Sequence, residues 1–379
     1  MKKETLAVFL IDGLRYEDDP TPTRILSTLG FRNVEASLFT GLPLAEHGQW
    51  TDYRFSSGGP FRFLRSVPLV QSVWDALPRK HRRYFGFLIF RCAALLGGNI
   101  PARSSLIPPR ILASTEFTQP LAADHKNAYP GSDSLFDLLR QKGRTWLYLA
   151  PPRLGFFGAS DLKVERRFYA SLKKGVRDFY FIKLGDLDGI CHRYGPESPE
   201  ARLCLRRTWR RFYGMRAALQ HAVSRLNWVC LSDHGFMTVD YTITPPQWLW
   251  RAFDEGRLRH FFIDSTILRL WLDRKEDSAY FETLCRGIPG LSLMSDDQTA
   301  SLGLKRGSSV SGDFCCVAPP GAVIWPDFFS VSPPKGMHGY APHPKLDSPI
   351  SYHGLDQLPE TVDHTEVGSW LKHHIDMRF

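Results

Sequence analysis

Four short apolar runs, separated by helical patterns, constrain the fold of this chain more than any other feature of its sequence. The runs cover residues 6–11, 146–150, 178–184 and 228–231. Short apolar runs that alternate with helical patterns are typical of a mostly parallel sheet covered by helices. We therefore predict one α/β domain over residues 1–379, with a mostly parallel central sheet sandwiched between helices.

Two of the helical patterns carry clear start signals. Ser134 precedes an apolar pattern that ends before Gly143, and Ser198 opens a longer pattern with apolar residues at three-and-four spacing. The other face of this longer helix carries four arginines, at Arg206, Arg207, Arg210 and Arg211. We interpret them as a solvated basic face, because no aromatic-rich RNA-binding signature accompanies them.

Two segments, residues 60–130 and 251–325, interrupt the alternating pattern. The first is rich in arginine, proline and aromatic residues, and the second contains the strand-like run IDSTILRLWL followed by a Gly/Ser-rich region. We predict that both are cap insertions, which together build a lid over the site.

Composition restricts the class of protein without selecting a function. Apolar residues make up 43% of the 379 residues and charged residues 23%, which excludes a mainly disordered, collagen-like or coiled-coil chain. Lys and Arg together number 48 against 39 Asp and Glu, a formal net charge of +9. This balance favours anionic partners, whether phosphorylated substrates, nucleic acid or an acidic membrane surface.

The cysteines and the apolar segments predict a cytoplasmic protein without a transmembrane segment. Seven cysteines are thinly spread and form no CxxC pair, which is typical of reduced thiols. The first apolar run ends in Asp-Gly and is too short for a secretory signal, so we interpret it as a buried strand. The stretch YFGFLIFRCAALLGG from Tyr84 is interrupted by Arg91 and is shorter than the ~20 residues that span a bilayer.

Polar clusters follow three of the four apolar runs, in the sequences IDG, GDLDG and SDHG. The carboxyl ends of parallel strands meet at one edge of a sheet, where ligands gather. A further histidine lies in MHGY, and glycines that allow sharp turns flank each cluster. We therefore expect one shared site, formed by Asp12, Asp188, His192, Asp233, His234 and His338.

Three carboxylates and three imidazoles form a mixed oxygen and nitrogen ligand set. Such a set suits zinc, manganese or iron better than calcium or magnesium. Six ligands are too many for one tetrahedral ion but suit two ions about 4 Å apart, which can bind an anionic tetrahedral centre between them. The sequence thus predicts two divalent transition-metal ions, with zinc favoured, and a small anionic, phosphorylated substrate.

The order of the motifs IDG, SLFTGLPLAEHG, DLDGICHRYG, SDHG and MHGY resembles the alkaline phosphatase superfamily. It is most similar to the type I phosphodiesterases and nucleotide pyrophosphatases, over most of the chain, with the cap segments fitting more loosely. The resemblance implies that Asp188, His192 and His338 hold one metal ion. It implies that a second ion is held by Asp12, Asp233 and His234.

The TG-x5-HG element of the family also matches, at Thr40, Gly41, His47 and Gly48. Gly41 is expected to end a helix, and Pro43 restarts the chain after it. We interpret His47 as a structural residue rather than a metal ligand.

The position of the family's nucleophile departs from the pattern. The resemblance implies a Ser or Thr ten residues before the Gly of TG, but that position holds Phe31. The run LGFRNVEASLFTG is one residue short, so we predict that Arg32 or Asn33 fills this corner, and neither is a normal oxygen nucleophile. Two hydroxyls lie further along the helix and should point elsewhere, namely Ser37 and Thr40.

The leading hypothesis is a two-metal hydrolase that acts on a phosphate ester or phosphodiester. Metal-bound hydroxide would attack directly, with Arg32 and Asn33 as the catalytic side chains that bind an anionic oxygen. One alternative is a biosynthetic metalloenzyme that performs non-hydrolytic chemistry on an anionic substrate. Another is a non-catalytic anion binder, although the complete ligand set argues against it. A nucleic-acid role rests on charge alone and is not favoured.

Overall fold

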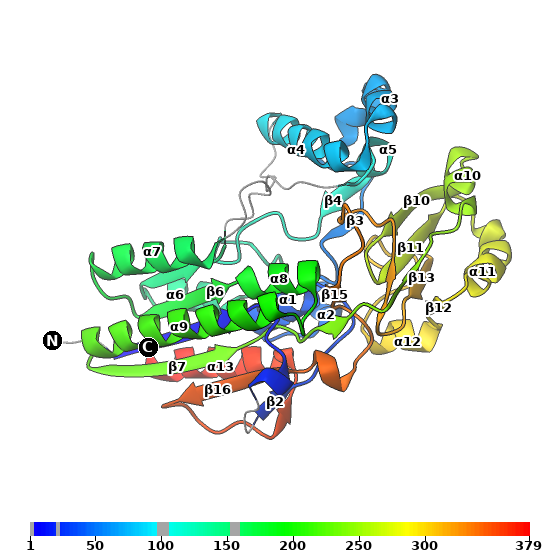
Figure 1. Cartoon of the computed structure of the whole chain (residues 1–379). Coiled ribbons are helices and arrows are strands. Elements are labelled where there is room, and N and C mark those ends of the chain that lie inside the picture. Colours follow the sequence, from blue (N-terminus) through cyan, green and yellow to red (C-terminus); the bar gives the residue numbers. More distant parts are fainter. Residues whose placement is uncertain (1–3, 20–22, 97–105, 152–159) are drawn as a thin grey trace.

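A seven-stranded sheet forms the centre of the computed structural model, which describes residues 4–19, 23–96, 106–151 and 160–379 (Figure 1). Strands β7, β1, β6 and β5 run parallel, whereas β16 is antiparallel to both β7 and β2. The predicted α/β fold with a mostly parallel central sheet is confirmed. In spatial order the strands are β17 (Thr361–Val362), β2 (Thr23–Ile25), β16 (Ser348–His353), β7 (Arg225–Leu231), β1 (Glu4–Ile11), β6 (Phe179–Leu184) and β5 (Trp146–Leu149).

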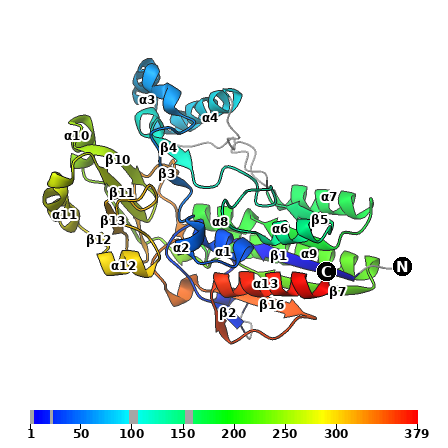
Figure 2. The same cartoon turned by 180° about the vertical axis from the view of Figure 1, so that it is seen from behind.

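Strand β1 is buried along almost its whole length because helices cover both faces of the sheet. Its alternate residues divide between two hydrophobic cores, with Leu6, Val8 and Leu10 on one face and Phe9 and Ile11 on the other. The first face packs against α1 (Asn33–Thr40), α6 (Leu135–Gln141) and α13 (His364–Arg378) (Figure 2). The second packs against α7 (Asp161–Leu172), α8 (Asp186–Tyr194) and α9 (Pro199–Ala222).

Both predicted helix starts are present in the structure. The Ser134 hydroxyl accepts a hydrogen bond from the Asp137 N–H, and the Asp137 carboxylate accepts one from the Ser134 N–H. The Ser198 hydroxyl accepts from the Ala201 N–H at the start of α9. Such caps satisfy amide groups that have no partner inside the helix, and each stabilises its helix by about 1 kcal/mol.

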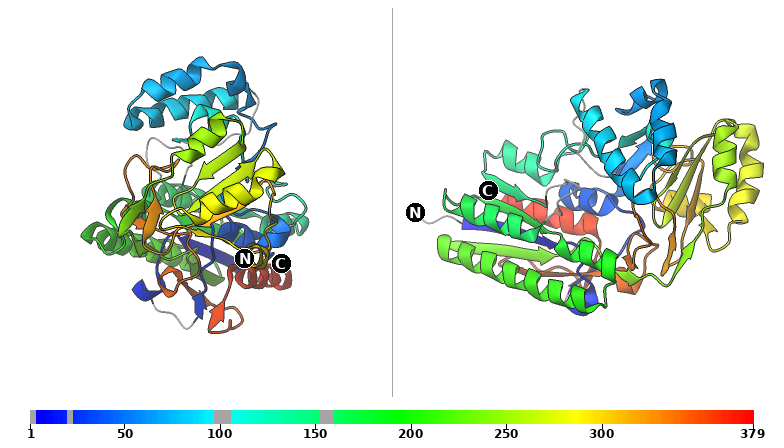
Figure 3. Two further views of the ribbon diagram at one scale, coloured as in Figure 1. Left: turned by 90° about the vertical axis from the view of Figure 1, so that its right-hand side faces the viewer. Right: turned by 45° about the horizontal axis from the view of Figure 1, so that its top comes forward.

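The cap has its own antiparallel sheet and lies beyond the carboxyl ends of the central parallel strands (Figure 3). Its strand order is β10 (Leu258–Ile263), β11 (Ile267–Leu272), β13 (Phe314–Val317) and β12 (Ser292–Leu293). The cap helices are α3 (Leu69–Ala76), α4 (Arg79–Leu95), α5 (Pro109–Leu112), α10 (Trp248–Asp254), α11 (Ser278–Arg286) and α12 (Asp296–Ser301). Shorter elements complete the chain: α2 (Leu44–His47), β3 (Tyr53–Phe55), β4 (Thr115–Phe117), β8 (Met237–Thr238), β9 (Tyr241–Ile243), β14 (Ala322–Ile324) and β15 (Gly336–Met337).

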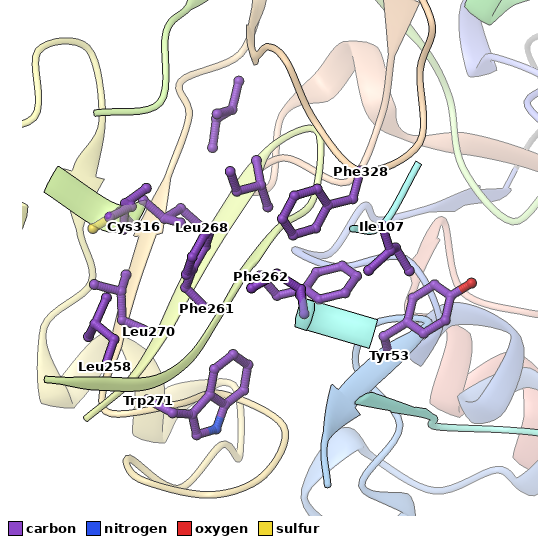
Figure 4. Close-up of a cluster of buried hydrophobic side chains, with 14 of the residues drawn as sticks. Tyr53, Ile107, Leu258, Phe261, Phe262, Leu268, Leu270, Trp271, Cys316 and Phe328 are labelled. Atoms are coloured by element: carbon purple, nitrogen blue, oxygen red, sulfur yellow. The ribbon is translucent and has the colours of Figure 1, made fainter. Parts of the chain in front are cut away.

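One hydrophobic core joins the two insertions that build the cap. Figure 4 shows Tyr53 and Ile107, from the first insertion, beside Phe262 and Phe328 of the second. The Tyr53 and Phe262 rings stack with their centroids 5.4 Å apart. These two parts of the chain therefore pack together in one core.

Two paired strands flank the first cap segment, which the sequence predicts at residues 60–130. These strands, β3 and β4, pair antiparallel. The residues that this segment contributes to the core of the cap run from Tyr53 to Phe117. The chain then returns to the central sheet, where Ala123, Ala128 and Tyr129 pack in the core beneath α1 and α6.

The most apolar stretch of the sequence lies in α4. Its buried residues Gly86, Ile89, Phe90 and Ala93 face the cap, and the Phe90 ring lies 4.8 Å from that of Phe61. Within the described ranges, no helix has both the length and the apolar character needed to cross a membrane.

Candidate metal centre

All six side chains predicted as metal ligands line one cavity of about 930 Å³. The cavity lies where the parallel strands end, because Asp12 follows β1 and Asp233 follows β7. The cap closes the other side with Asp264 and with residues 329–334. The remaining four ligands are Asp188 and His192 on α8, His234 after β7, and His338 after β15.

The first half of the cavity has a complete set of donor atoms for one metal ion. Asp188 Oδ1 lies 3.3 Å from His192 Nε2 and 3.7 Å from His338 Nε2, and the three donors lie within 4.8 Å of one another. His192 Nδ1 lies 3.0 Å from the Gly336 carbonyl oxygen, which holds a proton on Nδ1 and turns Nε2 toward Asp188. One carboxylate and two imidazoles suit zinc, manganese or iron.

The second half also has a group of three donors, but it shares one member with the first. His234 Nε2 lies 3.3 Å from Asp12 Oδ1 and 3.8 Å from Asp233 Oδ1, and its Nδ1 lies 3.0 Å from the Gly235 carbonyl oxygen. The compact donor group on this side consists of Asp12, His234 and Asp188, so Asp188 takes part in both groups. Asp233 Oδ1 instead accepts a hydrogen bond from the Gly13 N–H at 3.3 Å.

A lysine, which the sequence analysis missed, lies in this second half. The Lys183 ammonium contacts Asp233 Oδ2 at 3.0 Å, Asp12 Oδ2 at 2.7 Å and Glu35 Oε1 at 2.5 Å. Burial alone would lower the pKa of Lys183, but the three carboxylates outweigh it and raise this pKa well above its usual value. The only signal in the sequence is a charged residue near the end of the apolar run FYFIKL.

The chain directs Lys183 toward α1 because side chains alternate along a strand. Phe179 and Phe181 of β6 lie in the core beneath α1, and Lys183 continues the same face. Glu35, in the first turn of α1, reaches it from the other side. A strand and a helix far apart in sequence thus form this ion pair.

The histidines differ in how readily they hold a proton. Burial lowers the pKa of His234, but Asp233 and Asp12 outweigh it and raise this pKa to about 9. Burial and the neighbouring His234 and His192 lower the pKa of His338 well below its usual value. The His234 and His338 rings stack with their centroids 3.5 Å apart, and two charged rings would repel each other there. Burial also lowers the pKa of His192, but Asp188 outweighs it and raises this pKa, so protons would compete with a metal ion at both His234 and His192.

An aromatic ring, that of Phe31, lies beside the candidate metal centre. Phe31 lines the cavity and meets the His338 ring edge-on, with the centroids 5.4 Å apart. Gly339 makes room for it, because a Cβ at this residue, whose φ is +80°, would lie 2.5 Å from the Phe31 ring. The Phe31 side chain itself carries no hydroxyl.

The two residues predicted to fill this corner behave differently. Arg32 lines the cavity, but its Nε donates to Asp52 Oδ1 and its Nη1 to Glu35 Oε2, both at 2.6 Å. Asn33 is buried and does not line the cavity, because its Nδ2 donates to the Leu29 carbonyl oxygen at 3.2 Å. Binding of an anionic oxygen by Asn33 stays a prediction that this contact does not support, because the amide closes the loop that precedes α1.

His47 and the two helix hydroxyls lie outside this cavity. His47 Nδ1 accepts from the Gln49 N–H at 3.1 Å, so its Nε2–H donates to the Ser37 hydroxyl, also at 3.1 Å. Burial lowers the pKa of His47 to about 4, which keeps the ring neutral. Thr40 donates to the Ala36 carbonyl oxygen at 2.7 Å. These contacts are structural and do not activate a nucleophile.

The sheet topology and the carboxylate and imidazole set at the strand ends define the class: this is a protein of the alkaline phosphatase superfamily. The family model for type I phosphodiesterase/nucleotide pyrophosphatase matches residues 34–341, which is most of the chain. The chain therefore belongs to the type I phosphodiesterase/nucleotide pyrophosphatase family, and this membership supports phosphoester hydrolase activity.

Known relatives agree with the fold. The chain is similar to murine ectonucleotide pyrophosphatase/phosphodiesterase 5, solved as an inactive variant in complex with AMP, with a TM-score of 0.65 and 14% identity. The superposition covers 99% of this chain and 95% of that one. The human form of the same protein gives a TM-score of 0.63, at 14% identity over 99% of this chain and 95% of that one.

A curated relative matches a shorter segment. The ectonucleotide pyrophosphatase/phosphodiesterase family member 7 of Homo sapiens is 42% identical over 65 residues. This segment is 17% of the present chain and spans only 14% of the relative's length.

Proposed function

We propose that this protein is a metal-dependent hydrolase of phosphodiesters or phosphate esters, with water rather than a side chain as the attacking group. The proposal rests on three donor side chains, Asp188, His192 and His338. They line the same cavity as the cationic side chains of Arg83 and Arg193. A divalent ion held there would neutralise phosphoryl oxygens and make a bound water more acidic.

The side chains at the start of α1 support attack by water. By sequence spacing, the resemblance places the family's nucleophile at Phe31, whose side chain has no hydroxyl that could form a covalent phosphoryl intermediate. The hydrogen bond from His192 to the Gly336 carbonyl oxygen orients the imidazole for metal binding.

The cavity lining favours an anionic substrate with a planar group. Arg83 and Arg193 contribute positive charge to the wall, while Tyr148 and Phe329 offer aromatic faces. Aromatic faces can stack on nucleobases, and arginine binds phosphate through a planar fork. We therefore propose a nucleotide-type phosphodiester as the substrate class, and the complex of the murine relative with AMP supports this choice.

The test compares p-nitrophenyl phosphate with its bis-ester, with zinc or manganese added and after treatment with a chelator. We expect turnover of the bis-ester that a chelator abolishes and added metal restores. Asp188→Asn should abolish it, while Ser37→Ala, outside the cavity, should retain it. Turnover that survives complete metal removal, or that Asp188→Asn leaves unchanged, would contradict the proposal.

One observation favours a second candidate, a metalloenzyme or anion binder without hydrolytic activity. The aromatic ring of Phe31 replaces the hydroxyl on which hydrolysis in this family depends, as the sequence resemblance implies. A redox-active metal in the purified protein, together with no activity on either ester, would favour this candidate.

A further inference from the structure

Lys183 lies among the residues predicted to hold the second metal ion. Its ammonium has three N–H donors, and three carboxylates surround it: Asp12, Asp233 and Glu35. Two of these three carboxylates are the predicted oxygen ligands of the second ion. The Lys183 side chain also lines the cavity, so its charge faces the place where a substrate would bind.

Building on the hydrolase role proposed above, we infer that the Lys183 ammonium is the resident second cation of this site. The cavity then takes one divalent metal ion, at Asp188, His192 and His338. The site is a hybrid of one metal ion and one fixed ammonium, rather than a binuclear metal centre.

The donor atoms left over on the Lys183 side are too few for a tightly held ion. Asp12 Oδ2 and Asp233 Oδ2 contact the ammonium, and Asp233 Oδ1 accepts from the Gly13 N–H. Asp12 Oδ1 and His234 Nε2 remain, and the next donor, Asp188, belongs to the other ion. A divalent ion placed there would also be repelled by an ammonium that shares its ligands.

A chain of alternating charges fixes Lys183 in this position. Asp52 binds Arg32, Arg32 binds Glu35, and Glu35 binds Lys183, with distances of 2.6, 2.6 and 2.5 Å. The backbone of Lys183 is paired with Leu10 in the centre of the sheet, so the strand cannot shift. Movement of the ammonium out of the cavity would leave Glu35 and two aspartates without their shared cation.

The test counts metal ions in the full-length protein by elemental analysis and by titration with zinc or manganese alone. We expect one equivalent in the wild type and two in Lys183→Gln, because this change frees Asp12 and Asp233. Lys174→Gln, an exposed lysine on the surface, is the matched control and should stay at one equivalent. Two equivalents in the wild type, none, or only one in a folded Lys183→Gln protein would each overturn the inference.

A second pair of variants leaves Lys183 unchanged and so covers the case in which Lys183→Gln does not fold. His234→Ala should keep one equivalent of metal, whereas His338→Ala should keep none. Loss of the metal in His234→Ala, or its retention in His338→Ala, would assign the ion to the wrong half and refute the inference. One bound metal ion without turnover of either ester would contradict only the proposed function. Two bound metal ions with turnover would contradict only this inference.

Discussion

The two halves of the cavity have similar ligand residues but differ in what they can bind. In the His338 half, one carboxylate and two imidazoles converge, and a backbone carbonyl orients His192. In the His234 half, an ammonium already occupies two of the carboxylates. A ligand motif therefore does not by itself determine how many metal ions bind, because a residue outside the motif, here Lys183, can compete for the same donors.

The largest expected effect comes from breaking the His338 half. Asp188→Ala removes the only carboxylate of the first donor group and should release the metal while the fold stays intact. Loss of a cation that stabilises the transition state by several kcal/mol lowers turnover by roughly 10³-fold. Bis-ester hydrolysis, metal content and circular dichroism together check this prediction. Full metal occupancy in this variant would refute the ligand assignment.

Asp161 bears on the His338 half of the cavity because it holds the start of the helix that carries Asp188. Its Oδ1 accepts from the backbone N–H groups of Gly185 and Asp186, at 2.7 and 3.2 Å, and its Oδ2 has no hydrogen-bond partner among the residues that the structure describes. Burial, assisted by the Asp186 charge, raises the pKa of Asp161 from 3.8 to about 7. The folded state therefore binds this proton more tightly than the unfolded state does.

This proton makes folding stability depend on pH. Between the two pKa values the unfolded chain has lost the proton that the folded protein still holds, so the free energy of unfolding falls as pH rises and levels off above about 7. Relative to Asp161→Asn, the wild type should lose about 3 kcal/mol between pH 5 and pH 8. Urea unfolding of both proteins at the two pH values measures this, and equal pH dependence would contradict it.

Glu35→Gln tests whether a change beside Lys183 leaves the His338 half of the cavity unaffected. The change takes one carboxylate from both Lys183 and Arg32, so both cations lose a charged hydrogen-bond partner. We expect the free energy of unfolding to fall by about 2 kcal/mol. The first metal equivalent should bind as before, because Glu35 lies outside the His338 donor group. A titration that shows weaker binding of this first ion would count against the separation of the two halves.

The smallest expected effect lies outside both halves. Ser37→Ala removes the acceptor of the His47 N–H and should lower the free energy of unfolding by about 1 kcal/mol. Turnover and metal content should not change, because neither residue lines the cavity. A marked loss of turnover in a folded Ser37→Ala protein would revive this hydroxyl as a participant in the reaction.

The sequence predicted the sheet and the convergence of the six side chains because both depend on local patterns. Asp12 and Asp233 directly follow buried parallel strands, and parallel strands end at one edge. Asp188 and His192 are four residues apart, which places them on the same face of α8.

Other parts of the site depend on pairings that the sequence does not display. Lys183 lies inside an apolar run and finds Glu35 on an element 148 residues away. The orientation of Asn33 depends on a loop in which the Phe31 and Arg32 N–H groups both donate to the Trp50 carbonyl oxygen. The shared core of the two cap segments likewise forms through long-range contacts between Tyr53 and Phe262.

The joint core of the cap separates two tasks that often conflict in enzymes. The reacting groups stand on the rigid edge of the central sheet, while the opposite wall belongs to a unit with its own interior packing. Substitutions in that wall, such as at Phe329 or Pro333, can therefore change which molecules enter the cavity while the predicted metal ligands keep their positions. In evolution, such an arrangement lets one catalytic centre accept new substrates through changes in the cap alone.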